Sequence, residues 1–209
     1  MVWKQLISEL LTFGTLIAAI ALVLFLAFVA KNKSGKGVLG QIKNYVKKNS
    51  IQLALVVSLV ATLGSLFYSN IMGYDPCQLC WFQRIFMYPL PIILAVAWEY
   101  RDKGVKKFVI PLAIIGPAIS VFHYVQQIIE KSVGCDVGSA VDCSVKYTFD
   151  YAFITIPMMA LVAFLWVLVF MVLTENGQGK KPEEKGNGDS GEDGKEEENK
   201  VHVKSDSEE

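Results

Sequence analysis

Residues 75–84 read Asp75-Pro76-Cys77-Gln78-Leu79-Cys80-Trp81-Phe82-Gln83-Arg84, and they lie where one apolar stretch ends and the next begins. This position places a Cys-x-x-Cys pair at a membrane surface, with an arginine one helical turn further on. Two thiols at this spacing can form an exchangeable disulfide, and a nearby cation favours the reactive thiolate. A second pair, Cys135 and Cys143, follows in a later loop. Two cysteine pairs on one side of a membrane bundle suggest electron transfer through disulfides.

The apolar sequence is divided into blocks of membrane-spanning length. The chain has 209 residues, of which 53% are hydrophobic. The blocks fall near 10–30, 51–73, 85–100, 108–129 and 152–174. Most of them reach the roughly 20 residues that cross a bilayer, and the block at 85–100 does so only if Trp81, Phe82 and Arg84 lie near the interface. The pattern predicts an all-α membrane protein with five spans.

The first block has an alternative interpretation as a secretory signal peptide. Its apolar stretch runs from Leu10 to Ala30, which is longer than the apolar core of a typical signal peptide, and no convincing cleavage site follows it. We therefore expect residues 1–30 to form a retained transmembrane helix.

Lysine and arginine indicate the orientation of the spans. Residues 31–50 contain six lysines, and residues 101–107 contain Arg101 and three lysines. Both segments should be cytoplasmic by the positive-inside rule, and the lysine-poor connections 73–80 and 130–151 should be exported. The N-terminus is then outside and the C-terminus inside. All four cysteines fall on the exported side, where disulfides persist, although four cysteines allow three pairings.

Two further segments have a distinct composition. In residues 31–50, Val38, Leu39, Ile42, Tyr45 and Val46 recur at helical spacing between lysines. The segment is therefore either a basic interfacial helix on the inner leaflet or a solvated linker. Residues 175–209 carry twelve acidic and six basic residues and few large apolar ones. We expect this acidic tail to be disordered in the cytoplasm, because it cannot bury enough surface to fold.

The residues around the first cysteine pair favour a reactive thiolate. Asp75 is a plausible helix N-cap and Pro76 a plausible first helical residue, which would place Cys77 and Cys80 in the first turns, where the helix dipole favours an anion. Arg84 follows Cys80 by four residues, so both side chains should project from one helix face. Static disulfides with a snorkelling arginine are an alternative. A zinc site is another, although the second pair has a C-x7-C spacing and no histidine lies near either pair in the sequence.

Two motifs resemble a known family. The sequence Pro76-Cys77-x-x-Cys80-x-x-x-Arg84 resembles that of the DsbB/BdbC family of membrane disulfide-bond formation proteins, and His123-Tyr124-Val125-Gln126-Gln127 resembles the family's His-x-x-x-Gln before the second cysteine pair. The resemblance covers roughly residues 48–174, and the close spacing of Cys135 and Cys143 is more similar to the BdbC branch. It implies a four-helix redox domain over 51–174, with residues 1–30 as an additional helix of unassigned role.

The resemblance implies a thiol:quinone oxidoreductase in a bacterial inner or plasma membrane. Its expected partners are a DsbA-like, thioredoxin-fold thiol oxidase, a membrane quinone (ubiquinone or menaquinone) and the lipid bilayer, with no nucleic acid and no metal. The partner would attack a Cys135–Cys143 bridge at Cys135. Cys143 would then exchange with Cys77 and release Cys80 as a thiolate that faces the quinone.

The same resemblance implies quinone contacts for three residues outside the cysteines. Arg84 would stabilise the Cys80 thiolate and the charge that develops on the quinone, while His123 and Gln127 would contact the quinone. Without the family match, His123 is equally well explained as a core histidine. Two rival functions remain: the same relay run in the reducing direction, and a membrane scaffold whose exported loops carry structural disulfides. An arginine beside a Cys-x-x-Cys is not required by a structural bridge.

Overall fold

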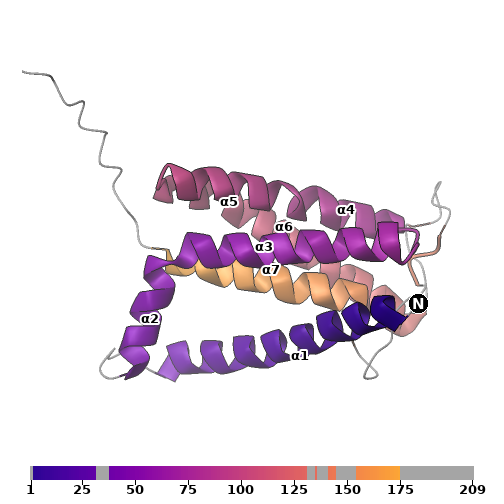
Figure 1. Cartoon of the computed structure of the whole chain (residues 1–209), viewed down its shortest axis with the longest axis horizontal. Helices are drawn as coiled ribbons and strands as arrows, with labels where there is room; N and C mark the ends of the chain where they lie inside the picture. The colour runs from indigo at the N-terminus through magenta and orange to yellow at the C-terminus, as the bar shows by residue number, and fades with distance from the viewer. Residues whose placement is uncertain (1, 32–37, 131–134, 136–140, 145–153, 175–209) are drawn as a thin grey trace, which may run out of the picture. The chain divides into compact units, whose positions relative to one another are not determined.

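The computed structural model describes residues 2–31, 38–130, 135, 141–144 and 154–174. Within these ranges the chain is helical and has no strand (Figure 1). In chain order, the helices are α1 (Val2–Lys31), α2 (Val38–Lys48), α3 (Ser50–Leu66), α4 (Gln78–Met87), α5 (Pro89–Glu99), α6 (Lys106–Ile129) and α7 (Ile156–Leu173). A π-helical turn at Phe67–Ile71 extends α3, and a 3₁₀ turn at Lys103–Val105 precedes α6.

Five segments are long and apolar enough to cross a membrane, which confirms the predicted fold class. They are Val2–Val29, Ser50–Ile71, Gln78–Glu99, Lys103–Ile129 and Ile156–Leu173. The short third block does extend back through Trp81, as its length required. It is divided at Tyr88, because Pro89 and Pro91 lack the N–H groups that would continue α4 into α5. The first helix begins at Val2 rather than near Leu10, so the polar residues ahead of the apolar block are also helical.

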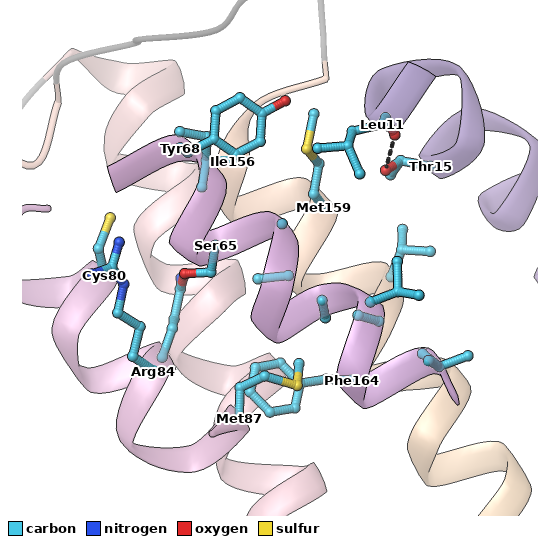
Figure 2. A pocket seen from close by; sticks show the side chains of 18 of the residues that line it. Leu11, Thr15, Ser65, Tyr68, Cys80, Arg84, Met87, Ile156, Met159 and Phe164 are labelled. Atoms are coloured by element: carbon cyan, nitrogen blue, oxygen red, sulfur yellow. Dashed lines mark hydrogen bonds between the residues drawn. The ribbon is translucent and has the colours of Figure 1, made fainter. Parts of the chain in front are cut away.

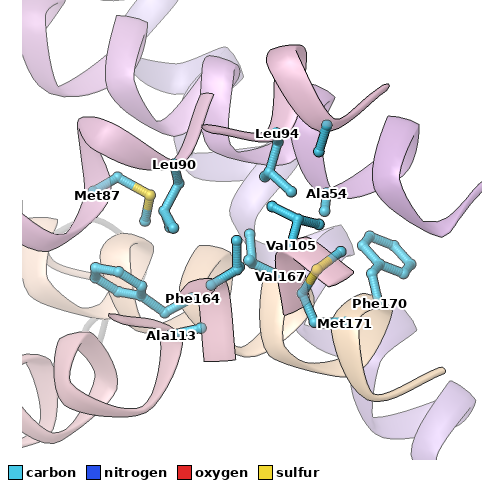
Figure 3. Close-up of a cluster of buried hydrophobic side chains, with 12 residues drawn as sticks. Ala54, Met87, Leu90, Leu94, Val105, Ala113, Phe164, Val167, Phe170 and Met171 are labelled. Carbon is cyan, nitrogen blue, oxygen red and sulfur yellow. The ribbon is translucent and has the colours of Figure 1, made fainter. Parts of the chain in front are cut away.

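The last four spans form a bundle with one apolar core. Helix α7 lies between α3 and α6, while α3 also packs against α5 and α4 packs against α6. The core side chains come from α3, α5, α6 and α7, with Met87 from the end of α4 and Val105 from the 3₁₀ turn, and they meet between these helices (Figure 3). Leu90, Leu94, Val109, Phe164 and Val167 have no exposed surface. Helix association inside a bilayer depends on such close packing, because lipid tails are as apolar as the side chains.

Close approach of α6 and α7 depends on Gly116. A Cβ atom at this position would lie 2.3 Å from the ring of Phe164, which is too close for any side chain without movement of the ring. The absence of a side chain at Gly116 therefore sets the distance between the two helices at mid-span.

Helix α1 docks against the bundle through polar contacts. The Lys4 Nζ donates to the carbonyl oxygen of Ile71, and the hydroxyls of Ser8 and Tyr68 lie 3.3 Å apart. Further along, the Trp166 indole N–H donates to the carbonyl oxygen of Ala18 over 3.0 Å. The N-terminal end of α1 thus lies beside the end of α3 that leads into the Cys-x-x-Cys segment.

The basic segment between the first two spans contains a helix. Of the two alternatives for residues 31–50, helix formation is observed over Val38–Lys48, and Ile42 and Tyr45 are exposed along it. Its position on the inner leaflet stays a prediction. The acidic tail at 175–209 lies outside the described residues.

Candidate redox site

Helix α4 begins later than the sequence suggested. The expected N-cap, Asp75, is wrong: Cys77 is the N-cap residue, with extended backbone (φ −67°, ψ 171°), and the helix starts at Gln78. The local preference of Asp and Pro for these positions is outweighed by tertiary contacts of the Cys77 side chain. Because Cys77 is the cap and Cys80 lies in the first turn, the two sulfurs are still next to the helix N-terminus.

The Cys77 thiol is buried among the other redox groups. Its sulfur lies 3.2 Å from the Cys80 sulfur and 3.6 Å from His123 Nε2. Both cysteines of this pair are free thiols. Cys77 also belongs to one buried cluster with Cys135 and Cys143. The fold therefore brings the two cysteine pairs together, as expected from their common side of the membrane.

A disulfide joins Cys135 and Cys143, whose Cα atoms are 6.1 Å apart. The Cys135 sulfur lies 3.9 Å from Gln126 Oε1 on α6, and Gln126 is almost completely buried. The glutamine side chain therefore lies against one of the two bridge sulfurs. The family motif led to a predicted quinone contact for Gln127, whereas the sequence assigned no role to Gln126.

His123 is held in one orientation by a residue that the sequence did not single out. Gln83, which is buried on α4, has its Nε2 atom 3.3 Å from His123 Nδ1. With Gln83 donating to Nδ1, the proton of the neutral ring is on Nε2 and points at the Cys77 sulfur. Gln83 follows Cys80 by three residues, so helical periodicity was the one signal that could have placed it on the cysteine side.

The environment of Cys77 favours its thiolate. The hydrogen bond with the Cys80 side chain lowers the pKa of the Cys77 thiol to about 4, burial opposes this change, and the hydrogen bond from His123 supports it. The dithiol form of the pair is therefore stabilised as one thiolate and one thiol. The surroundings of Cys77 thus stabilise an anion directly, and the Cys80 thiolate that the resemblance implied stays a prediction.

On its other side, the cysteine pair borders a cavity of about 560 Å³. Cys80 and Arg84 project into it from the same face of α4, as their spacing predicted (Figure 2). Most of the remaining lining is apolar and comes from α1, α3 and α7. Ser65 and Tyr88 add two hydroxyls, which lie 3.2 Å apart. A mostly apolar cavity with a few polar groups at one place is the usual form of a small-molecule site.

Arg84 can act on a ligand in this cavity. Its guanidinium lies 5.4 Å from the centre of the Trp81 ring, a cation–π contact that orients the side chain. No carboxylate among the described residues forms an ion pair with it. His123 and Gln127 are buried, but neither is among the described residues that line the cavity, so their contact with a quinone stays a prediction.

The fold also creates a set of metal-ligand atoms that the sequence did not show. No histidine lies near the cysteines in the sequence, yet the donor atoms of Cys77, Cys80 and His123 lie within 4.8 Å of one another. Two thiolates and an imidazole suit a soft or borderline cation. Such a cation competes with disulfide formation, because it needs both sulfurs as thiolates.

These features define an integral-membrane thiol–disulfide oxidoreductase: several apolar spans, a Cys-x-x-Cys at a helix start, and a loop disulfide packed against it. Comparison with known proteins specifies the family. The model of the family "Disulfide bond formation protein DsbB" matches residues 47–174, and the chain belongs to this family. It is therefore a disulfide-forming enzyme of the membrane. No solved structure matches the chain significantly.

Curated relatives carry consistent names. Disulfide bond formation protein C of Bacillus subtilis (strain 168) is 47% identical over 129 residues, which cover 61% of this chain and 91% of the relative. A probable disulfide formation protein of Oceanobacillus iheyensis is 41% identical over 146 residues, covering 66% of this chain and 99% of the relative. A probable disulfide formation protein of Deinococcus radiodurans is 37% identical over 131 residues, covering 58% of this chain and 85% of the relative.

Proposed function

We propose that the protein reoxidises an exported thioredoxin-fold thiol oxidase and passes the electrons to a membrane quinone. One observation carries this proposal: the two cysteines of the Cys-x-x-Cys face different surroundings. Cys77 is buried in one cluster with the Cys135–Cys143 disulfide and does not line the cavity, while Cys80 packs against the edge of that cluster and also lines the apolar cavity. A dithiol pair that lies between a loop disulfide and a site for a lipid-soluble acceptor can pass electrons from the loop cysteines to the acceptor.

The proposed sequence of exchanges begins with both pairs oxidised. A partner thiolate attacks Cys135, which releases the Cys143 thiolate. Cys143 attacks Cys77 and breaks the Cys77–Cys80 bond, and Cys80 leaves as a thiolate. The second partner thiol then attacks the mixed disulfide, so the partner is oxidised and Cys135 is freed. Cys135 attacks Cys143, which restores the loop disulfide and leaves Cys77 and Cys80 reduced.

The structure corresponds to the last state of this sequence, with a loop disulfide and two free thiols at the Cys-x-x-Cys. A quinone in the cavity would accept two electrons and two protons as the Cys77–Cys80 disulfide forms again. The cavity suits this group, because its walls are apolar and its polar residues gather around Cys80. Arg84 would donate hydrogen bonds to a carbonyl oxygen there, and Tyr88 offers a hydroxyl nearby.

His123 contributes to the same pair from the other side. The Nε2 proton of His123 points at Cys77, so we assign His123 the role of stabilising the Cys77 thiolate. A direct contact of His123 or Gln127 with the quinone rests on the family resemblance alone, because neither residue lines the cavity. The names of the relatives favour the oxidising direction over the reducing one. We also propose that the cysteine loops are extracytoplasmic, that residues 51–174 form the redox domain, and that residues 31–50 and 175–209 are cytoplasmic.

Quinone reduction by the purified protein tests this function. Reduced thioredoxin-fold oxidase serves as donor and a naphthoquinone or benzoquinone as acceptor, and quinol formation is followed by absorbance. Cys80→Ser should abolish quinol formation. Arg84→Ala should raise the apparent KM for quinone by roughly ten- to a hundredfold, because charge-assisted contacts contribute about 1.5–3 kcal/mol. Arg84→Lys should recover part of the loss, since it restores the charge but not the planar fork.

Phe82→Leu is the matched control, because Phe82 is exposed on α4 and does not line the cavity. It should leave the apparent KM unchanged. Full quinone reduction by Cys80→Ser would overturn the proposed relay. An unchanged KM in Arg84→Ala, with only a lower yield of folded protein, would instead reduce Arg84 to a snorkelling residue.

A further inference from the structure

Helix α1 lies outside the region that matches the family, yet it forms one wall of the cavity. The family match covers residues 47–174, whereas α1 is Val2–Lys31. Five residues of α1 line the cavity: Leu10, Leu11, Gly14, Thr15 and Ala18. In Figure 2, Leu11 and Thr15 face the cavity from the side opposite Cys80 and Arg84. Without α1, this side of the cavity would open to lipid.

The contacts of α1 hold this wall in place. The Ser8 and Tyr68 hydroxyls pair at one end of the cavity, and Tyr68 also lines it. At the other end of the cavity, the Trp166 indole donates to the carbonyl oxygen of Ala18, and both residues line the cavity. The Trp166 ring lies 5.9 Å from that of Phe25. The stretch of α1 that lines the cavity therefore follows the first attachment, at Ser8, and ends at the second, at Ala18.

The cavity is elongated, and its chemical character changes along its length. Along α3 and the π-helical turn that extends it, the lining runs from Val56 to Tyr68, near the Cys-x-x-Cys. Twelve residues of helix correspond to about 18 Å. The end at Cys80 and Arg84 is polar and redox-active, whereas the part between Val56, Val60 and Ala18 is apolar. This arrangement fits a molecule with a polar, reducible head and a long hydrocarbon chain.

We propose that α1 encloses the isoprenoid tail of the quinone and so selects for tailed quinones. This inference rests on the proposed function and adds a role for the helix. The small residues of the wall leave room for the tail: a Cβ atom at Gly14 would meet no atom within 4 Å. An isoprenoid chain is a better occupant than a phospholipid acyl chain, because the polar end of the cavity presents a thiol and a guanidinium to the attached head group.

The experiment fills the empty space at Gly14. Gly14→Phe should protrude into the cavity without a clash, and Ile17→Phe adds a similar side chain at an exposed position of α1 that does not line the cavity. Binding is measured as quenching of intrinsic tryptophan fluorescence by two naphthoquinones, menadione without a tail and a menaquinone with four isoprene units. Thr15→Leu, which also changes a residue that lines the cavity, is a second variant of the α1 wall. Thermal unfolding without quinone shows whether each variant folds.

We expect Gly14→Phe and Thr15→Leu to weaken binding of the tailed quinone by roughly tenfold or more, equivalent to about 1.4 kcal/mol or more. Menadione binding should stay within about twofold of the unaltered protein, as should both quinones with Ile17→Phe. Equal binding of the tailed quinone by all variants would overturn the role of α1 and leave the proposed function intact. The same weakening for both quinones would also overturn it, because the wall would then touch the head group.

Two other outcomes are distinct. If the unaltered protein binds neither quinone and transfers no electrons to them, the proposed function itself fails. If the wall variants keep their quinone affinity but lose phospholipid that copurifies with the unaltered protein, the wall covers a lipid chain and the proposal is wrong.

Discussion

Cys77 joins the two halves of the site, and its ionisation influences the redox balance of the pair. Its sulfur is close to both Cys80 and His123, and its pKa is lowered to about 4. A lowered thiol pKa stabilises the reduced, dithiol form at neutral pH. Stabilisation of the reduced form makes a disulfide a stronger oxidant. The Cys77–Cys80 pair is therefore suited to accept electrons from the loop cysteines.

We predict that reduced Cys77 remains reactive under mildly acidic conditions. A group with a lowered pKa stays ionised as pH falls until that pKa is approached, so alkylation by iodoacetamide should be nearly independent of pH from about 8 to roughly 5.5. In His123→Ala the pKa should rise, and the decline in rate should begin at higher pH. Mass spectrometry of the alkylated peptide gives the rate. Burial slows alkylation at every pH, so the pH of half-maximal rate is the readout.

His202→Ala serves as the control, since it removes the second histidine of the sequence and should leave the profile unchanged. A half-maximal rate near the ordinary thiol pKa in the unaltered protein would contradict the ionisation described for Cys77. An unchanged pH profile of alkylation in His123→Ala would mean that the hydrogen bond with Cys80 alone lowers the pKa of Cys77.

At the scale of the elements, the close contact between α6 and α7 requires glycine at position 116, and this requirement can be measured. Gly116→Ala places a Cβ atom against the Phe164 ring, which is fully buried and also lines the cavity. Overpacking of this kind costs about 1–3 kcal/mol. We expect a lower thermal unfolding temperature in detergent, and the double variant with Phe164→Leu should recover part of the loss.

Gly64→Ala is the matched control for this prediction. Its new Cβ atom would lie 3.8 Å from the Leu11 side chain, an ordinary van der Waals distance. It should unfold at nearly the same temperature as the unaltered protein. If Gly116→Ala is as stable as Gly64→Ala, the close approach of α6 and α7 is not required.

The elements also show how far the sequence could predict the structure. Apolar length predicted all five spans, because a bilayer imposes one length on every helix. The predicted start of α4 at Asp75 was wrong, because the Cys77 side chain makes tertiary contacts, and the preference of Asp for an N-cap position does not reflect such contacts. Cys80 and Arg84 could be placed on one helix face from spacing alone.

Contacts between distant segments could not be predicted from the sequence. Local patterns describe one helix at a time, whereas the pairing of Gln83 with His123 joins α4 to α6. The contribution of α1 to the cavity wall could not be predicted for the same reason, since the sequence of an apolar helix does not indicate which neighbouring helix it will pack against. The same limit explains why the sequence did not indicate the contact between Gln126 and the Cys135 sulfur.

For the whole molecule, orientation in the membrane is the property on which the proposed relay depends. In a variant with all four cysteines replaced by serine, a single cysteine is introduced at Asn70 or at Asn44, both of which are exposed. A membrane-impermeant maleimide should label Asn70→Cys on intact cells. It should label Asn44→Cys, in the basic segment, only after the membrane is opened.

Labelling of Asn44→Cys on intact cells would contradict the orientation, and with it the exported position of the cysteine pairs. Labelling of neither site on intact cells, with labelling of both after the membrane is opened, would place both ends of α3 in the cytoplasm and contradict the span Ser50–Ile71 as well as the exported position of the Cys-x-x-Cys. Disulfide relay to an exported oxidase would then be impossible.

The separate surroundings of Cys77 and Cys80 have a kinetic consequence for the proposed reaction. In this scheme the protein partner and the quinone would approach different ends of one short chain of sulfur atoms, so neither would need to be present when the other reacts. The proposed relay therefore predicts that the enzyme stores an electron pair between two independent half-reactions, in a double-displacement (ping-pong) scheme. A bulky, water-soluble donor and a lipid-soluble acceptor can therefore use one catalyst without ever forming a ternary complex.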